Sequence, residues 1–464
     1  YFMLTNQNKK EILLQCVKTG ADFAELFIEN TTDITIKVIG ESVDDINTSK
    51  LHGASLRLLK GMEETFGYTN DVSYDGLMSL ANKLNKFYNF APVITDFDFN
   101  DEQTLNKTII NKASTEEPLS KKIKYCQMIN EGSSSYDKTI VQSIANCMEH
   151  VQNIEVYNTN GVSKNDFRNV IRFAGIAIAQ NENGKQTGSY YYGGNFGLDA
   201  YDNFDFKGLG IEAAKQAIVM LNASQVKGGV YDVVINNAFG GVIFHEACGH
   251  ALEASSVARG LSVFANKLGE KVASDCVTAI DDGTIANEWG SANIDDEGHV
   301  TQKNVLIENG ILKSYMVDYK NSRLMNTAQT GSGRRESYRY IPTSRMTNTY
   351  IANGKYEFED LIKNTKYGIF AKSLGGGSVN PATGEFNFSI NEGYMIEDGK
   401  ITKPIRGATL IGKGTEVLMN IDMVANNQTF GYGICGASSG NIAACVGQPT
   451  IRVRNMTVGG NGGN

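Results

Sequence analysis

The sequence predicts an α+β fold in two parts: an N-terminal α/β domain with a mixed or antiparallel sheet over residues 1–225, and a C-terminal strand-rich domain over residues 226–464. Three observations lead to this prediction. Apolar residues at helical spacing alternate with period-two segments in the first part. A polar stretch that ends in two glycines, residues 222–229, separates the parts. Short apolar segments between glycines dominate the second part, so we expect strands joined by tight turns there.

The N-terminal domain begins with a helical pattern in which Ile12, Leu13, Cys16 and Val17 fall on one face. Three period-two segments follow and predict an antiparallel meander with one covered face. A polar excursion over 92–118 separates this meander from a region, 120–200, whose pattern is mostly strands. The expected elements are helices at 7–19, 75–88 and 207–222 and strands at 23–29, 34–38, 54–59, 154–158, 170–179 and 188–192.

The C-terminal domain begins with a buried strand at 231–235, which runs through residues 236–241 into an apolar helix. That helix carries the segment His245-Glu-Ala-Cys-Gly-His250. From 270 to 464 we expect short strands and glycine turns, with Gly375-Gly-Gly377 as an example.

Composition and charge exclude several classes of function. The formal net charge of −8 argues against a nucleic-acid binder, because no broad basic face is available to phosphates. No apolar run approaches the ~18 residues that cross a bilayer, and the first residues lack the basic and apolar regions of a signal peptide. The seven cysteines are an odd number and contain no C-x-x-C pair, which suits a reducing compartment. We therefore expect a cytoplasmic protein.

Two imidazoles and a carboxylate lie within six residues of a chain that has only five histidines. Neutral imidazole is the commonest zinc ligand, and a glutamate beside the first histidine can act as general base on a metal-bound water. An unpaired buried carboxylate is costly, so a metal or water beside Glu246 explains its presence. The segment predicts a zinc site held by His245 and His250.

The spacing of the two histidines is unusual. They lie five residues apart, which on a regular helix places them roughly 140° apart around the axis. Two ligands at that angle cannot easily meet one metal. A shared metal therefore requires a π-type bulge or a widened turn at 247–249, and Gly249 is the natural position for it. A regular helix through both histidines would contradict a shared metal.

The residues alone leave the third ligand open. Glu253 lies three residues after His250 and could reach the same face. Asp295, Asp296 and Glu297 form an acidic cluster beside His299. Cys435 lies in a glycine-flanked segment that could present its thiol on a tight backbone. We expect Cys248, inside the motif, to point away and to serve packing only.

Two weaker features could bind substrate. Arg334 and Arg335 form a local basic cluster that could hold a peptide carboxylate or backbone, although paired arginines of purely structural role are as plausible. Gly375, Gly376 and Gly377 lack the lysine and the helix of a phosphate-binding loop. Their small size instead permits a tight turn or close approach of an extended substrate.

The segment His245-Glu-Ala-Cys-Gly-His-Ala-Leu-Glu253 resembles the H-E-x-x-x-H signature of the TldD/PmbA metallopeptidases, on the TldD side. The resemblance extends over nearly the whole chain, including the N-terminal meander. Its later blocks are Asp295–Gly298, Leu306–Leu312, Gly333–Tyr338, Pro342–Thr349, Lys403–Leu410 and Gly447–Thr450.

The resemblance implies a zinc-dependent peptidase that hydrolyses unfolded or extended peptides. It further implies that His245, His250 and Cys435 hold Zn²⁺ and that Glu246 is the base. Members of this family often work as heterodimers with a paralogous subunit that lacks the zinc motif, and a homodimer is an alternative.

Two other functions remain as alternatives. The motif also resembles the zinc helix of dipeptidyl-peptidase III, a zinc exopeptidase that takes its third ligand from a second acidic motif, but that enzyme is rich in helices whereas this chain is rich in strands. The chain could instead be a non-catalytic peptide-binding subunit of a hetero-oligomeric protease. Glu246 argues against the latter, because a purely structural zinc site needs no base.

Overall fold

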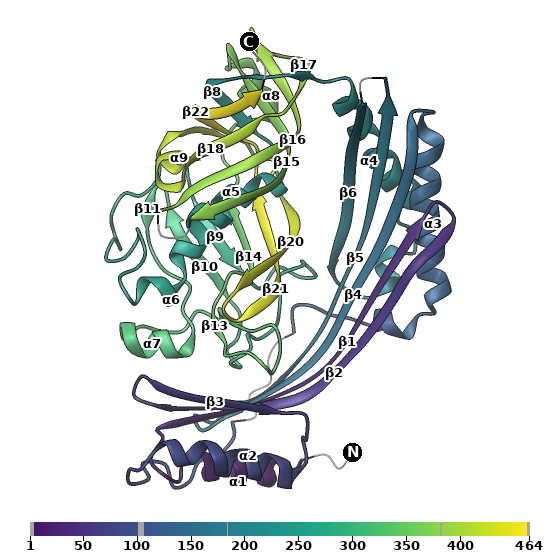
Figure 1. Ribbon diagram of the computed structural model, residues 1–464. Helices are drawn as coiled ribbons and strands as arrows, with labels where there is room; N and C mark the ends of the chain where they lie inside the picture. The colour runs from purple at the N-terminus through teal and green to yellow at the C-terminus, as the bar shows by residue number, and fades with distance from the viewer. Residues whose placement is uncertain (1–3, 101–105, 183, 381–382, 462–464) are drawn as a thin grey trace.

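The computed structural model describes residues 4–100, 106–182, 184–380 and 383–461 (Figure 1). It confirms an α+β, strand-rich fold. The first sheet has six strands in the order β3-β2-β1-β4-β5-β6, and every neighbouring pair is antiparallel. Its strands are β1 (Phe23–Ile39), β2 (Ser42–Lys60), β3 (Glu63–Thr69), β4 (Ile140–Asn158), β5 (Ser163–Asn181) and β6 (Gly184–Asn195).

The predicted meander is confirmed, but its strands are longer than expected. The segments predicted at 23–29 and 34–38 are parts of the single 17-residue strand β1, since residues 30–33 stay paired with both neighbours. The polar run Asn30-Thr-Thr-Asp33 interrupts the apolar pattern without interrupting the backbone ladder. β1, β2, β4 and β5 together form a long curved ribbon (Figure 1).

Four helices cover this sheet. α1 (Asn6–Val17) and α2 (Tyr74–Leu84) pack at one end, and α3 (Leu119–Tyr136) and α4 (Phe206–Leu221) pack at the other (Figure 1). Short 3₁₀ turns occupy Asn85–Phe87, Ser114–Glu116 and Leu198–Tyr201.

The sequence prediction missed α3, because the buried face of this helix is largely polar or small. Lys122, Asn130 and Ser133 are buried on it, so the apolar spacing of a helix is weak. Lys122 Nζ lies 2.6 Å from Glu149 Oε2 on β4, and both side chains are fully buried. This ion pair replaces the apolar contact that would have revealed the helix.

The second half of the chain, from residue 224 onward, contains two large sheets and one two-stranded sheet. One large sheet follows the order β15-β8-β22-β18-β16-β17-β7, and the additional pairing of β15 with β16 closes part of it into a ring; β19 pairs with β22. Its strands are β7 (Ser224–Gln225), β8 (Lys227–Ile235), β15 (Tyr367–Asn380), β16 (Glu385–Glu397), β17 (Lys400–Arg406), β18 (Thr409–Lys413), β19 (Ile421–Val424) and β22 (Ile451–Asn461).

The other sheet of this half has the order β11-β10-β9-β14-β21-β20, and β12 (Gly333–Arg334) pairs separately with β13 (Thr343–Ser344). Its strands are β9 (Ala279–Asp282), β10 (Lys303–Glu308), β11 (Ile311–Leu312), β14 (Asn348–Ile351), β20 (Thr429–Ala437) and β21 (Gly440–Gln448). The short helices of this half include α6 (Ala254–Val257), α7 (Tyr319–Met325), α8 (Phe358–Lys363) and α9 (Gly414–Asn420).

Short strands were expected to dominate after residue 270; β9 to β14 are short, but β15, β16 and β22 have 14, 13 and 11 residues. The glycines that suggested turns lie inside these strands instead. A Cβ on Gly377 would lie 2.1 Å from the carbonyl oxygen of Asn387, so this glycine permits close backbone approach. β7, just before the expected boundary at 225, already pairs with β17. The division into two domains stays a prediction.

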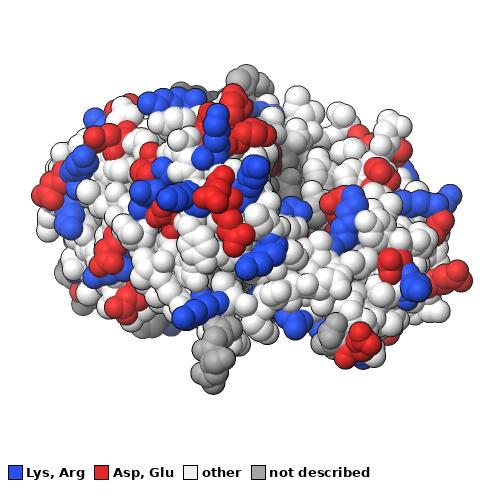
Figure 2. Space-filling view, turned by 90° about the horizontal axis from the view of Figure 1, so that it is seen from above, with Lys and Arg blue, Asp and Glu red and all other residues white. Residues whose placement is uncertain are grey.

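The described residues contain no helix with the length and apolar character that a membrane span requires. Figure 2 shows basic and acidic side chains intermingled over the face that it presents. This face offers no field of one sign.

Candidate metal centre

The histidine segment follows β8 through a strained turn. Ala238 adopts φ 55° and donates its N–H to the Gln448 carbonyl oxygen at 3.2 Å. A Cβ on Gly241 would lie 2.5 Å from the carbonyl oxygen of Gly447. The missing side chain lets the helix start directly against β21. Residues 239–252 then form four consecutive helical segments: the 3₁₀ turn η4 (Phe239–Gly241), the helix α5 (Val242–Phe244), η5 (His245–Gly249) and the 3₁₀ turn η6 (His250–Leu252).

The element η5 is a π-helix, which confirms the predicted widened turn. The N–H of His250 donates to the carbonyl oxygen of His245, five residues back. The two imidazole centroids are 5.2 Å apart with their planes at 84°. Gly249 packs against Met346, whose Sδ would lie 2.3 Å from a Cβ at that position. The π turn thus places both histidines on one side of the helix.

Cys435, on β20, completes a group of three potential metal ligands. Its Sγ lies 3.3 Å from His245 Nε2 and 3.4 Å from His250 Nε2. The ligand atoms of all three residues lie within 4.8 Å of one another. Tetrahedral zinc, with bonds of about 2.0 Å to nitrogen and about 2.3 Å to sulfur, separates such ligands by roughly 3.5 Å. The donor set therefore fits zinc in both chemistry and spacing.

The electrostatics of the group favour a thiolate. Burial opposes ionisation of Cys435, but hydrogen bonds and positive charge from His245 and His250 lower its pKa to about 4. Burial alone would depress the pKa of His250, yet the carboxylate of Glu253 and the Cys435 sulfur raise it well above its ordinary value. A thiolate is the form in which cysteine binds metals.

Glu246 lies beside this group and is accessible. Its Oε2 is 3.7 Å from His250 Nε2, and its side chain is 30% exposed. The carboxylate lines a cavity of about 630 Å³. The other lining residues include Ser189 and Tyr191 on β6, Phe239 and Val242 before the motif, Gly375–Val379 on β15, and Phe388 and Asn391 on β16.

The three glycines predicted to contact substrate line this same cavity. Gly375, Gly376 and Gly377 lie where the β15–β16 register is irregular. A Cβ on Gly376 would have no atom within 4 Å. One wall of the cavity is therefore backbone with open space beside it, opposite β6 of the first sheet.

Glu253 lies close to the group but behind it. Its Oε1 is 3.2 Å from His250 Nδ1, the nitrogen that faces away from Cys435. Burial raises its pKa, against the attraction of His250 and Arg345. Glu253 thus contacts a candidate ligand without joining the ligand group that the described residues form.

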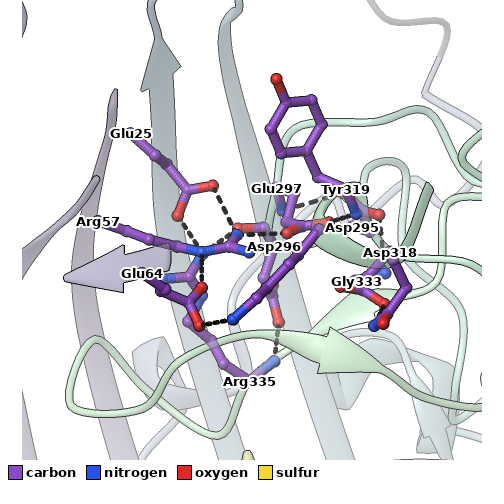
Figure 3. Close-up of polar contacts among 12 residues, drawn as sticks. Glu25, Arg57, Glu64, Asp295, Asp296, Glu297, Asp318, Tyr319, Gly333 and Arg335 are labelled. Atoms are coloured by element: carbon purple, nitrogen blue, oxygen red, sulfur yellow. Dashed lines mark hydrogen bonds and ion pairs between the residues drawn. The ribbon is translucent and has the colours of Figure 1, made fainter. Parts of the chain in front are cut away.

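The acidic cluster at 295–297 lies elsewhere, in a buried network between the first sheet and the second half (Figure 3). Asp295 accepts the backbone N–H groups of Gly333 and Glu297. Asp296 accepts from Arg168 at 2.7 Å, and Glu297 from Arg57 at 2.5 Å. All three side chains are committed to the interior of the protein, which does not fit the third-ligand alternative.

Arg334 and Arg335 are buried as well, so their expected contact with substrate needs correction. Arg335 Nη2 donates to Glu25 on β1 and to the backbone oxygen of Asp296 (Figure 3). Arg334 Nη1 donates to the carbonyl oxygen of Met346 at 2.7 Å. Burial, only partly offset by Asp296, lowers the Arg334 pKa to about 10. These guanidinium groups connect segments of the protein and do not line the cavity beside Glu246.

The other cysteines near the motif are outside the ligand group. Cys248 is buried, and burial raises its pKa beyond the ordinary range, as expected for packing. Cys445 Sγ lies 3.8 Å from Glu288 Oε2. The sequence reasoning did not single out Arg345, which is buried and donates to the Cys435 carbonyl oxygen at 2.6 Å. The only signal for it was its place in the block Pro342–Thr349.

A convergent His-His-Cys group offers three protein ligands, as catalytic zinc sites do, and a partly exposed carboxylate lies beside it at a cavity. Models of the PmbA/TldA metallopeptidases match nearly the whole chain: domain 1 at residues 24–85, the central domain at 112–221 and the C-terminal domain at 228–460. The chain belongs to the TldD/PmbA family of metallopeptidases.

Comparison with individual proteins supports the same family. A "Metalloprotease TldD homolog" of Haemophilus influenzae is 36% identical over 449 residues, covering 95% of this chain and 93% of the relative. A "Zinc metalloprotease TldD homolog" of Saccharolobus solfataricus is 32% identical over 262 residues, covering 56% of this chain and 58% of the relative. The crystal structure of TldE from Thermococcus kodakarensis has a TM-score of 0.76 at 20% identity, covering 97% of this chain and 99% of that chain. This last likeness shows a shared fold.

Proposed function

We propose that this chain is a zinc-dependent peptidase that hydrolyses unfolded or extended peptides, with His245, His250 and Cys435 as zinc ligands and Glu246 as general base. The convergence of Cys435 Sγ on both imidazole Nε2 atoms, at 3.3 and 3.4 Å, carries the proposal. The Saccharolobus relative that is named a zinc metalloprotease supports the choice of metal.

His245, His250 and Cys435 would hold the zinc ion, which would supply a Lewis acid for the peptide carbonyl and for water. Glu246 takes a proton from the attacking water and delivers it to the leaving amine. Its exposed carboxylate in the cavity suits this exchange, since it meets both solvent and substrate. Cys435 and His245, by contrast, are buried.

The cavity suggests the substrate class. Its β15 wall, with Gly375–Gly377, exposes backbone rather than side chains, and β6 opposite is the last strand of the first sheet. An extended peptide can bind such walls by strand addition, which reads main chain more than side chains. A folded protein cannot present its backbone in this way.

The family suggests the partner of this chain, and its cysteines suggest the compartment. We propose a dimer, either of two copies or with a paralogous subunit of the TldE kind, whose fold this chain shares. The seven cysteines are free thiols, which suits the reducing cytoplasm.

The two alternatives receive less support. A site of the dipeptidyl-peptidase III kind needs an acidic third ligand, but Asp295, Asp296 and Glu297 are held in the buried network. A non-catalytic subunit leaves the position of Glu246 unexplained. It would be favoured if the zinc-loaded chain cleaved no peptide until a second subunit was added.

Glu246→Gln tests the proposal. Removing the base should lower the cleavage rate of an unstructured fluorogenic peptide by about 10²–10⁴-fold and leave the bound zinc unchanged by metal analysis. Glu359→Gln, at an exposed position on α8, is the matched control and should cleave like the parent. A Glu246→Gln protein that cleaves as fast as the parent would overturn the role of Glu246.

A further inference from the structure

His250 is held from both sides of its ring. Nε2 lies 3.4 Å from Cys435 Sγ, and Nδ1 lies 3.2 Å from Glu253 Oε1. His245 differs, since its buried Nδ1 has no hydrogen-bond partner among the described residues. The orientation of His245 thus depends on packing, whereas that of His250 depends on one carboxylate.

The backbone fixes the position of Glu253. The residue ends the motif run with extended dihedral angles, φ −73° and ψ 129°, and forms a β-bridge with Met316. Its side chain is 7% exposed. The carboxylate therefore cannot turn to solvent, and its contact with His250 is a built feature of the interior.

Arg345 lies between this carboxylate and the segment that carries Cys435. Its Nη2 donates to the Cys435 carbonyl oxygen at 2.6 Å. Its Nη1 donates to Ser439 Oγ at 2.8 Å and to the Gly440 carbonyl oxygen at 2.9 Å. Its Nε lies 4.0 Å from Glu253 Oε1. One fully buried guanidinium thus hydrogen-bonds across the β20–β21 hairpin and lies at ion-pair distance, without a hydrogen bond, from the residue behind His250.

We propose that Glu253 and Arg345 are positioning residues of the metal centre: Glu253 holds the His250 imidazole with its proton on Nδ1 and its lone pair on Nε2, and Arg345 fixes Glu253 and the Cys435 hairpin together. Carboxylates that accept the second N–H of a metal-binding imidazole set its tautomer and ring orientation. Arg345 contacts the hairpin that carries Cys435 and lies beside the carboxylate that contacts His250, so it is placed to couple the two ligands. This inference rests on the proposed zinc site.

The test measures the zinc dissociation constant of the full chain by competition with a chromogenic chelator. Glu253→Ala should weaken zinc binding by about 10–100-fold. Glu253→Gln keeps an oxygen acceptor for Nδ1–H and should recover most of the affinity. Arg345→Lys keeps the charge but cannot span the hairpin contacts, so we expect a loss of about tenfold. In each cobalt-loaded protein, the sulfur-to-cobalt absorption band reports whether Cys435 still binds.

Glu149→Ala is the control, because it removes a fully buried carboxylate on β4 outside the site. It should keep the zinc affinity of the parent. The positioning roles are wrong if Glu253→Ala binds zinc like the parent, or if Glu149→Ala loses as much affinity. A parent that binds no zinc would overturn the proposed metal site itself. A parent that binds zinc but cleaves no peptide would contradict only the peptidase function.

Discussion

Cys435 Sγ lies 3.3 Å from His245 Nε2, although 190 residues separate them in the chain. His245 lies on the π turn η5, which follows β8 of the sheet that contains the ring, and Cys435 lies on β20 of the other sheet. The candidate metal centre therefore lies at the junction of two sheets, and its geometry depends on how the helix start packs against β21.

Gly241→Ala tests that dependence. The added Cβ would lie 2.5 Å from the Gly447 carbonyl oxygen. Its three nearest atoms are all backbone atoms of Gly447, which cannot move aside as a flexible side chain could. We expect a loss of about 1–3 kcal/mol or more in the free energy of unfolding, measured by urea titration, together with weaker zinc binding. Gly376→Ala, where the new Cβ meets no atom within 4 Å, should unfold like the parent. Equal stability of the two variants would contradict this packing.

The glycine wall of the cavity predicts an effect on substrate binding alone. Gly376→Val fills the open space where we place the peptide backbone. It should raise KM for an unstructured peptide by roughly tenfold while kcat stays close to the parent value, because it removes binding shared by ground and transition states. Steady-state kinetics measure both constants, and zinc content and the thermal midpoint should not change. An unchanged KM would place the peptide elsewhere.

The buried network of Figure 3 predicts a pH effect on stability. Burial raises the pKa of Glu297 to about 8; the attraction of Arg57 opposes this rise, and the carboxylates of Asp318 and Asp295 add to it. The unfolded carboxyl has an ordinary pKa of about 4.3. The folded protein thus holds this proton more firmly between pH about 4.5 and about 8, and the stability it contributes is lost as pH rises through that window.

Glu297→Gln keeps the shape of the side chain but cannot titrate. Its free energy of unfolding, relative to the parent, should therefore increase from pH 6 to pH 8.5 in urea titrations. The exposed Glu308→Gln should show no such trend. A relative stability that falls or stays flat with pH would show that Glu297 is already ionised at pH 6.

Local spacing in the sequence predicted the unusual helix but could not locate the partners of the histidines. The five-residue interval between His245 and His250 was enough to require a π turn, because helix geometry is local. Glu253 was one of three candidates for the third ligand, but it contacts His250 at Nδ1, away from Cys435, and three-residue spacing could not tell which ring nitrogen it meets. The place of Cys435 depends on the β20–β21 register and on Arg345, which no local pattern encodes.

The same limit explains the errors elsewhere. Arg335 formed an apparent basic cluster in the sequence, but its carboxylate partner, Glu25, lies 310 residues away. The buried face of α3 is satisfied by Glu149 on a later strand. Periodicity identifies apolar faces, so elements buried through ion pairs escape it.

X-ray absorption at the zinc edge of the purified, zinc-loaded chain measures whether Cys435 binds zinc together with His245 and His250. We expect two nitrogen ligands at about 2.0 Å and one sulfur at about 2.3 Å, with the sulfur lost in Cys435→Ser and kept in Cys445→Ser. A parent spectrum without sulfur, or a sulfur shell that persists in Cys435→Ser, would contradict this expectation.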